Sequence, residues 1–253
     1  MRVFATYNIK GGVGKTATAV NLAHLSARDG YRTLVWDLDP QGAASFYFRI
    51  QPKIDGGAKR LIKGKLDPSR LIRGTDFLDL DLLPADFSYR HMDLALEDSG
   101  DPTRRLAHLL LPLSEEYDHL FLDCAPSISR VSEGIFVAAD ALLVPTIPTT
   151  LSLRTLDQLH RHLSKKGPKR LQVLPFFCMV DRRKKLHRRI VAEISEASPY
   201  PFLETQIPYS SLVEQMGLHR APLTSWAAPS TPPVRAYEEL WDEVMRQSRG
   251  SRQ

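Results

Sequence analysis

The sequence predicts an α/β fold, with a doubly wound and mostly parallel sheet flanked by helices. Apolar runs alternate with helical patterns throughout the 253 residues, as in a parallel sheet covered by helices. Polar residues directly follow several of these runs, at the sheet edge where doubly wound folds bind ligands. No internal repeat or long linker interrupts the pattern. We therefore expect a single domain over residues 1–253, with a frayed end at residues 249–253.

The expected strands are short apolar runs that end at polar residues or proline. They cover residues 2–8, 32–37, 77–84, 119–123, 141–145 and 171–179. Helical spacing predicts helices from residue 16 onward, at 104–117 and at 151–165. A proline-containing break at 227–233 precedes a last helix, whose apolar face is formed by Val234, Tyr237, Leu240, Trp241, Val244 and Met245. We expect this face to pack on the core.

Composition narrows the class of protein. Hydrophobic residues make up 43% and charged residues 25% of the chain, as in ordinary globular proteins. Cys124 and Cys178 lie far apart without metal-ligand spacing, which favours buried thiols in a reducing compartment. No apolar run approaches the roughly 20 residues that span a bilayer, and the chain begins directly with a strand pattern. We expect a cytoplasmic protein without a signal peptide and without stable membrane insertion.

A glycine-rich segment lies between the first predicted strand and the first predicted helix. Its order is Lys10-Gly11-Gly12-Val13-Gly14-Lys15-Thr16-Ala17. Glycines let successive backbone N–H groups converge on an anion, and the following helix N-terminus adds partial positive charge. Lys15 can reach the β- and γ-phosphates, and the Thr16 hydroxyl can ligate Mg²⁺. The segment predicts a nucleotide-phosphate site, although Ile9 stands where the strict pattern has glycine.

Lys10, just before the double glycine, makes the segment resemble the deviant Walker A motif of the ParA/MinD family of P-loop ATPases. The resemblance implies slow ATP hydrolysis with ATP and Mg²⁺ as cofactors. It also implies a homodimer formed on ATP binding, in which Lys10 reaches the partner's nucleotide. The implied nucleotide contacts are Lys10, Gly11, Gly12, Val13, Gly14, Lys15, Thr16 and Ala17.

A pair of carboxylates ends the second predicted strand, in Asp37-Leu38-Asp39-Pro40-Gln41-Gly42. Carboxylates at positions i and i+2 of a strand point to the same side, and one of them can polarise a water or hold Mg²⁺. The string resembles the family's second nucleotide motif. This resemblance implies that Asp39 activates water and that Asp37 supports it, so the implied catalytic residues are Lys10, Lys15 and Asp39. Ala43 stands where the family usually has Asn.

Asp123 closes another buried apolar run, in the Walker B arrangement. A carboxylate there meets the Mg²⁺ shell opposite the Thr16 hydroxyl, so the expected metal residues are Thr16, Asp39 and Asp123. A weaker resemblance at residues 205–210 places Pro208 near the base of the nucleotide. Tyr209 and Ser210 replace the arginine and asparagine of the family pattern there.

The net charge is +5, with a pI near 9.2, which favours a polyanionic partner. Six cations fall within eight positions with no acid between them: Arg182, Arg183, Lys184, Lys185, Arg188 and Arg189. Self-repulsion disfavours such a run without an anion, and ParA-like proteins bind DNA non-specifically. We therefore expect these residues to contact DNA phosphates. A second basic stretch, residues 53–73, is either a solvated loop and helix or a second DNA contact.

Together these features predict a ParA-like ATPase that is nucleoid-associated, is stimulated by a partner protein, and segregates or positions cargo. The alternative is a MinD-like membrane-cycling ATPase, but the polar face of the last helix is acidic, with Glu238, Glu239, Asp242 and Glu243. A third class amidates or carboxylates small acids, or carries metals. It is disfavoured because His160, His162 and His187 form no cluster and are expected at the surface.

Overall fold

The computed structural model describes residues 1–194 and 201–250, and its central feature within that range is an eight-stranded sheet. The strand order is β3-β4-β2-β5-β1-β6-β7-β8, and all neighbours pair in parallel except β3 with β4. The strands are β1 (Arg2–Thr6), β2 (Thr33–Asp37), β3 (Arg73–Gly74), β4 (Leu80–Leu83), β5 (His119–Asp123), β6 (Ala141–Thr146), β7 (Gln172–Val180) and β8 (Gln206–Pro208). The predicted α/β fold is confirmed.

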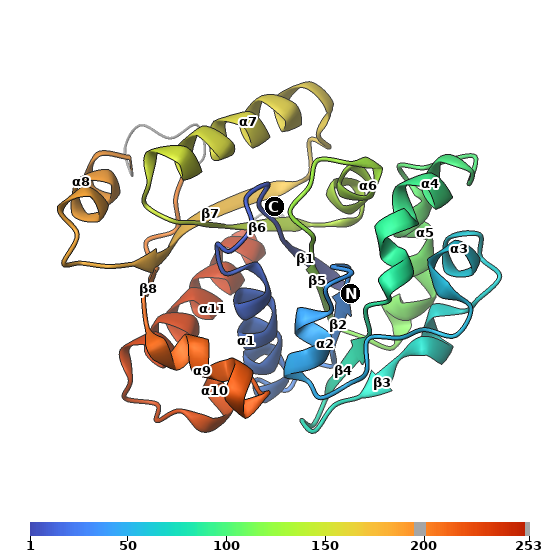
Figure 1. The fold of residues 1–253 in the computed structure, drawn as a ribbon, viewed down its shortest axis with the longest axis horizontal. Coiled ribbons are helices and arrows are strands. Elements are labelled where there is room, and N and C mark those ends of the chain that lie inside the picture. Colours follow the sequence, from blue (N-terminus) through green and yellow to red (C-terminus); the bar gives the residue numbers. More distant parts are fainter. Residues whose placement is uncertain (195–200, 251–253) are drawn as a thin grey trace.

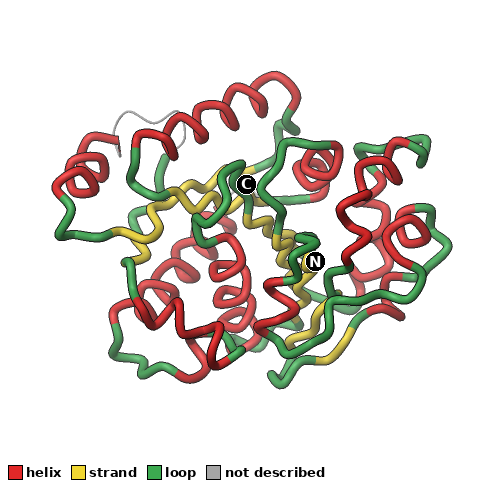
Figure 2. The backbone as a smooth tube through the Cα atoms, viewed as in Figure 1, coloured by secondary structure: helices red, strands yellow, loops and turns green. Residues whose placement is uncertain are grey.

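Helices cover both faces of the sheet, as Figures 1 and 2 show. One face carries α1 (Lys15–Arg28), α2 (Ala43–Tyr47), α9 (Ser211–His219), α10 (Leu223–Trp226) and α11 (Pro232–Gly250). The other carries α3 (Gly57–Ile62), α4 (Met92–Glu97), α5 (Arg105–Leu110), α6 (Arg130–Ala138), α7 (Thr150–Lys166) and α8 (Lys185–Ile194). Short 3-10 helices lie at Pro68–Leu71, Phe87–His91 and Leu111–Glu115. The two faces bury two separate apolar clusters.

Among the predicted elements that are shorter in the structure than in the sequence pattern, two have a clear local cause. The helix expected at 104–117 ends as an α-helix at Leu110 and continues as a 3-10 helix. Pro112 explains this, because proline lacks an N–H group and its ring clashes with the carbonyl one turn earlier. The strand expected from residue 77 begins only at Leu80, because Asp79 has a left-handed backbone with φ 57°.

The last helix packs on the core as expected. Tyr237, Leu240 and Trp241 are buried, and the Trp241 ring meets Phe4 at 5.9 Å between centroids. Glu243 was wrongly assigned to the acidic polar face, because it is 6% exposed and its carboxylate accepts the backbone N–H groups of Glu204 and Thr205. This contact ties α11 to the chain that enters β8. Arg249 and Gly250 belong to α11, and the rest of the expected frayed end, 251–253, lies outside the described residues.

Both cysteines are buried free thiols, which confirms the prediction of their burial. Among the helices of the described chain, none is long and apolar enough to cross a membrane.

A buried histidine links β5 to α1 and β2. The ring nitrogen Nδ1 of His119 lies 2.8 Å from the Ser26 hydroxyl, which itself lies 2.8 Å from the Thr33 hydroxyl. The ring also packs against Tyr31, at 4.3 Å between centroids. Burial lowers the pKa of His119 to about 4, even though the neighbouring Asp118 carboxylate acts in the opposite direction.

Acid should destabilise the protein through this histidine. His119 takes up a proton near pH 6.5 in the unfolded state but only near pH 4 in the folded state. The neutral histidine therefore makes its full contribution to stability above pH 6.5, and this contribution is lost as the pH falls. Between pH 7 and pH 5 the wild type should lose about 2 kcal/mol more than His119→Gln in urea unfolding. Identical losses for the two proteins would contradict this assignment.

Candidate nucleotide-binding site

The glycine loop leaves β1 at the centre of the sheet and enters α1 at its carboxyl edge. Gly12 and Gly14 have left-handed backbones, with φ 69° and 97°. At Gly14 the space is also restricted, because a Cβ there would lie 2.9 Å from Cys178 Sγ on β7. Only glycine therefore lets the loop pass this close to the sheet.

Lys15 lies at the start of α1 and is 7% exposed. Its ammonium nitrogen donates to the Lys10 carbonyl at 3.3 Å, so the side chain folds back over the loop. Burial lowers the pKa of Lys15, while the nearby Asp123 and Asp39 carboxylates act in the opposite direction. The side chain is thus held in a pocket of backbone and carboxylates, beside the position where a phosphate would sit.

Asp37 organises the loop that carries Asp39. Asp37 is fully buried, and one carboxylate oxygen accepts both the backbone N–H and the hydroxyl of Ser45 on α2, each at 2.8 Å. The other oxygen accepts the Asp39 N–H at 3.3 Å. Burial raises the pKa of Asp37 to about 6, opposed by the Ser45 hydrogen bonds.

The predicted same-side arrangement of Asp37 and Asp39 on one strand is wrong. β2 ends at Asp37, so Asp39 lies in the following turn, where its carboxylate accepts the Gln41 N–H at 2.9 Å. This separates the two acids: Asp37 is sealed in the core, and Asp39 lines a cavity above the glycine loop.

Asp123 is fully buried at the end of β5, in register with Asp37 on β2 and Thr6 on β1. One oxygen lies 3.4 Å from the Thr6 hydroxyl, whereas the other is buried and has no hydrogen-bond partner in the described part of the chain. Burial and the Asp37 charge raise the pKa of Asp123 well above its usual range, and the Thr16 hydroxyl and Lys15 ammonium oppose this shift. An unsatisfied buried carboxylate oxygen facing Thr16 is suited to the shell of a divalent cation.

Within the described residues, no group of three or more His, Cys, Asp or Glu side chains could hold a metal by itself. Mg²⁺ in nucleotide sites needs no such cage, since one or two carboxylates and the substrate phosphates suffice. The predicted set of Thr16, Asp39 and Asp123 fits that kind of site.

A cavity of about 350 Å³ opens beside the loop. The predicted residues that line it are Gly11, Gly12, Gly14, Lys15, Thr16, Ala17, Asp39 and Pro208. Three predicted residues do not: Val13 and Asp123 are fully buried, and Lys10 points away, with its ammonium 3.3 Å from the Ser152 hydroxyl on α7.

Sequence reasoning missed the far wall of this cavity. Ile207, Tyr209 and Ser210 lie beside Pro208 in the segment 205–210 that resembles the family pattern. The missed lining residues are Tyr47, Pro126, Cys178, Met179, Val213, Glu214 and Tyr237, which come from five separate segments. A hydrogen bond of 2.9 Å from the Tyr209 hydroxyl to Glu214 closes this end.

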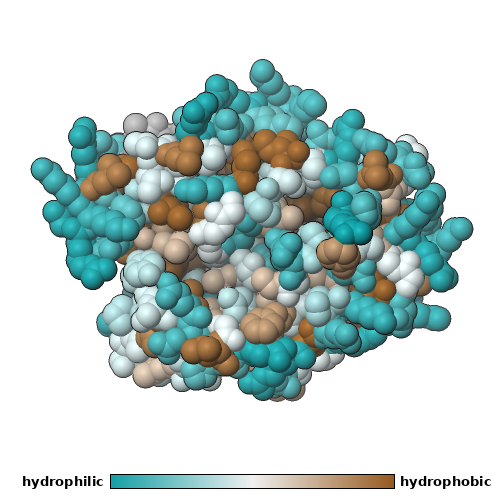
Figure 3. Space-filling view, viewed as in Figure 1, coloured by the Kyte–Doolittle hydropathy of each residue, from teal (hydrophilic) through white to brown (hydrophobic). Residues whose placement is uncertain are grey.

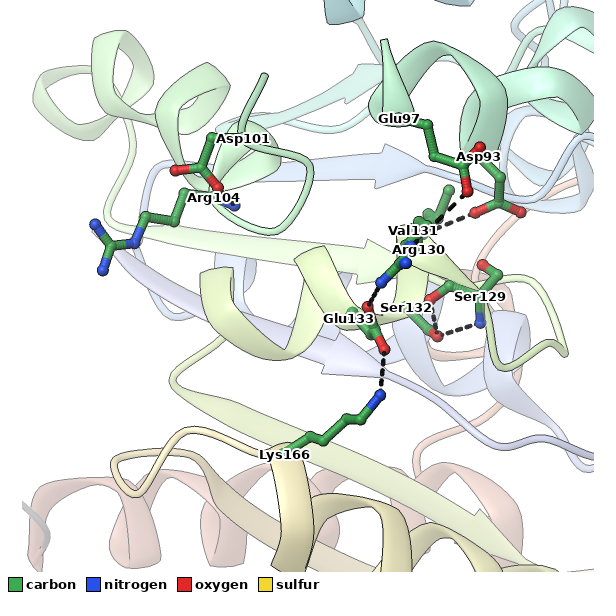
Figure 4. A network of polar contacts seen from close by, with 10 residues as sticks. All are labelled: Asp93, Glu97, Asp101, Arg104, Ser129, Arg130, Val131, Ser132, Glu133 and Lys166. Carbon is green, nitrogen blue, oxygen red and sulfur yellow. Dashed lines mark hydrogen bonds and ion pairs between the residues drawn. The ribbon is translucent and has the colours of Figure 1, made fainter. Parts of the chain in front are cut away.

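The segment after Asp123 is anchored from three sides. The Tyr7 hydroxyl donates to the Ser127 carbonyl at 2.7 Å, and Ser129 and Ser132 form a capping box at the start of α6. Asp93 on α4 accepts the Val131 N–H at 2.9 Å, as Figure 4 shows. In the same figure Glu133 pairs with both Arg130 and Lys166, which joins α6 to α7.

The basic segment 182–189 follows β7 and opens α8, as predicted. Figure 3 shows hydrophilic side chains gathered over α8 at the left edge of the molecule. Flanking acids neutralise part of its charge, because Arg183 pairs with Asp181 at 2.9 Å and Arg189 with Glu193 at 2.8 Å. The surface position expected for His187 is wrong: it is 5% exposed, and its ring accepts the Asp181 N–H.

Comparison with known proteins agrees with this geometry. A family model described as an AAA domain matches residues 1–171. The chromosome partitioning protein ParA of Myxococcus xanthus is 32% identical over 198 residues, covering 76% of this chain and 70% of that protein. The sporulation initiation inhibitor protein Soj of Bacillus subtilis is 26% identical over 251 residues, covering 96% and 98%.

A solved structure is also similar throughout. Cobyrinic acid a,c-diamide synthase from Mycobacterium smegmatis, with bound ATP analog and magnesium, has a TM-score of 0.84 at 25% identity, covering 100% of this chain and 97% of that one. The fold and glycine loop define a P-loop nucleotide-binding protein. The chain belongs to the ParA/MinD family of P-loop ATPases.

The close approach at Gly14 can be tested against a matched glycine. Gly14→Ala should destabilise the protein by about 1–3 kcal/mol more than Gly100→Ala and weaken ATP binding. Gly100 has a similar φ of 83° but nothing within 4 Å of its Cβ position, so it carries the backbone strain without the clash. Adding Cys178→Ala should restore part of the loss. Equal effects at the two glycines, in thermal unfolding and ATP titration, would contradict this account.

Proposed function

We propose that this protein is a ParA-like ATPase that binds ATP with Mg²⁺, dimerises on ATP, binds DNA non-specifically and uses slow hydrolysis to segregate or position cargo. The observation that carries the proposal is that the side chains of two lysines in the glycine loop point in different directions. Lys15 lines the cavity beside its own loop, whereas Lys10 points out of it toward α7.

The cavity residues support ATP hydrolysis by positioning and electrostatics. Backbone N–H groups of the loop and the Lys15 ammonium would hold the β- and γ-phosphates. Thr16, Asp39 and Asp123 would hold Mg²⁺, which when bound neutralises charge on the phosphates. Asp39, partly exposed in its turn, would orient the attacking water. Pro208 would contact the base at the far end of the cavity.

Lys10 supports a homodimer. Among the described residues its ammonium has only the Ser152 hydroxyl as a side-chain partner, at 3.3 Å, so it would be free to reach a phosphate on a facing subunit. ATP would then join two subunits and hydrolysis would release them, which makes the protein a timed switch. A partner protein would stimulate the hydrolysis.

Non-specific DNA is the proposed polyanion, which would place the protein on the nucleoid in the cytoplasm. The support is the exposed cationic segment 182–189 and the relatives ParA and Soj. The MinD-like alternative is less well supported, because the apolar face of α11 is packed on the core and Glu238 pairs with Arg28 at 2.8 Å. Such a helix has no free apolar face for lipid.

Dimerisation tests the proposal directly. Lys10→Ala should abolish ATP-dependent dimerisation in sedimentation velocity while retaining much of the ATP affinity. Lys59→Ala, at an exposed lysine of α3, is the control and should dimerise normally. Asp39→Ala should dimerise on ATP but not hydrolyse it. Normal dimerisation of Lys10→Ala would rule out action across the interface.

A further inference from the structure

A second cavity, of about 450 Å³, shares Pro208 of β8 with the nucleotide cavity. Its lining includes Arg182 in the turn after β7, Gln206 and Pro208 of β8, and Arg235 and Glu239 of α11. Arg235 is 53 positions away from Arg182 in sequence, and no sequence pattern joins them. The fold therefore brings two arginines into one polar cavity.

Neither guanidinium forms an ion pair with a described residue. No ion pair or side-chain hydrogen bond in the described part of the chain uses Arg182 or Arg235, although Glu239 lines the same cavity. The contrast with neighbouring Arg183 and Arg189 is sharp, because each of these has a carboxylate within 3 Å. Two cations that form no ion pair and one acid, Glu239, line the cavity, so its charge favours an anion between the two arginines.

The donors in this cavity are side chains rather than the helix end. α11 begins with Pro232 and Pro233, which have no N–H group, and the Arg235 N–H already donates to the Thr231 carbonyl at 3.1 Å. The ligand must therefore suit planar, bidentate guanidinium groups. Phosphate oxygens do so, and arginine is the residue that binds them in this manner.

We propose that this cavity is a phosphate-binding subsite for the DNA backbone, formed by Arg182 and Arg235. The inference rests on the proposed DNA binding and deepens it, since it adds a residue of α11 to the DNA-contacting surface. It also distinguishes residues within the basic segment 182–189: Arg182 contacts phosphate, whereas Arg183 and Arg189 are each paired with a carboxylate. Pro208 lines both cavities, so the subsite adjoins the proposed nucleotide site.

Four single variants of equal charge test the subsite. Arg182→Ala and Arg235→Ala should each weaken binding of a 60-base-pair duplex by about tenfold at moderate salt. Because the two arginines share one phosphate, removing both should reduce the salt slope by about one. Arg183→Ala and Arg189→Ala remove the same charge outside the cavity and should cost less than about threefold. Because Arg182 and Arg235 share one phosphate, the double variant should bind more tightly than the product of the single effects predicts.

Every protein is measured with ATP and Mg²⁺, after ATP titration has shown that the fold and nucleotide site are intact. Equal losses for all four variants, with DNA binding by the wild type, would overturn the subsite alone. A wild type that binds ATP but no DNA would overturn both the subsite and the proposed DNA binding. Capture by phosphatidylglycerol vesicles that depends on Arg182 and Arg235, with no such dependence for DNA, would also overturn the assignment.

Discussion

The structure is built around two buried carboxylates on neighbouring strands. Asp37 and Asp123 end β2 and β5 in register, and neither side chain is exposed to solvent. Like charges in such surroundings raise each other's pKa and cost free energy unless a cation is near. For Asp37, this free-energy cost is offset by the hydrogen bonds that Ser45 and the Asp39 N–H donate to its carboxylate. Within the described residues, one oxygen of Asp123 has no hydrogen-bond partner, and this is where we propose that a cation binds.

This constraint explains the arrangement of the surrounding elements. Lys15 is buried at the start of α1, where its charge opposes the carboxylates, and the glycine loop must pass close to β7 to place it there. The same hydrogen bonds that satisfy Asp37 fix α2 and the turn of Asp39 above the loop. Phosphate, metal and water are thus expected at one edge of the sheet. Lys10 points away from that edge, which is why it is the residue proposed to act on a second subunit.

The sequence was sufficient for the fold class, the glycine loop and the burial of Asp123, because these follow from local periodicity and a contiguous motif. It was insufficient wherever a contact depends on packing between distant segments. Tyr47 and Tyr237 in the cavity wall share no motif with the glycine loop that they face, and Arg235 lies 53 positions from Arg182. The placing of Asp39 on the strand of Asp37 and the start of the strand near Asp79 were predicted wrongly, because turn geometry depends on backbone angles that alternating hydrophobicity does not report. His187 and Glu243 were placed at the surface, because a polar residue type does not reveal a buried backbone partner.

The most direct test of the account is the stability of Asp123→Asn with and without ligands. Without nucleotide, this variant should melt at or above the wild-type temperature, because it removes a buried carboxylate of which one oxygen has no hydrogen-bond partner in the described part of the chain. The wild type should gain about 5 °C when Mg²⁺ is added to the ATP-bound protein, and the variant should gain almost none of this increment. A variant that melts well below the wild type without ligands, yet gains the full Mg²⁺ increment, would contradict the proposal that the site is completed by a cation at Asp123.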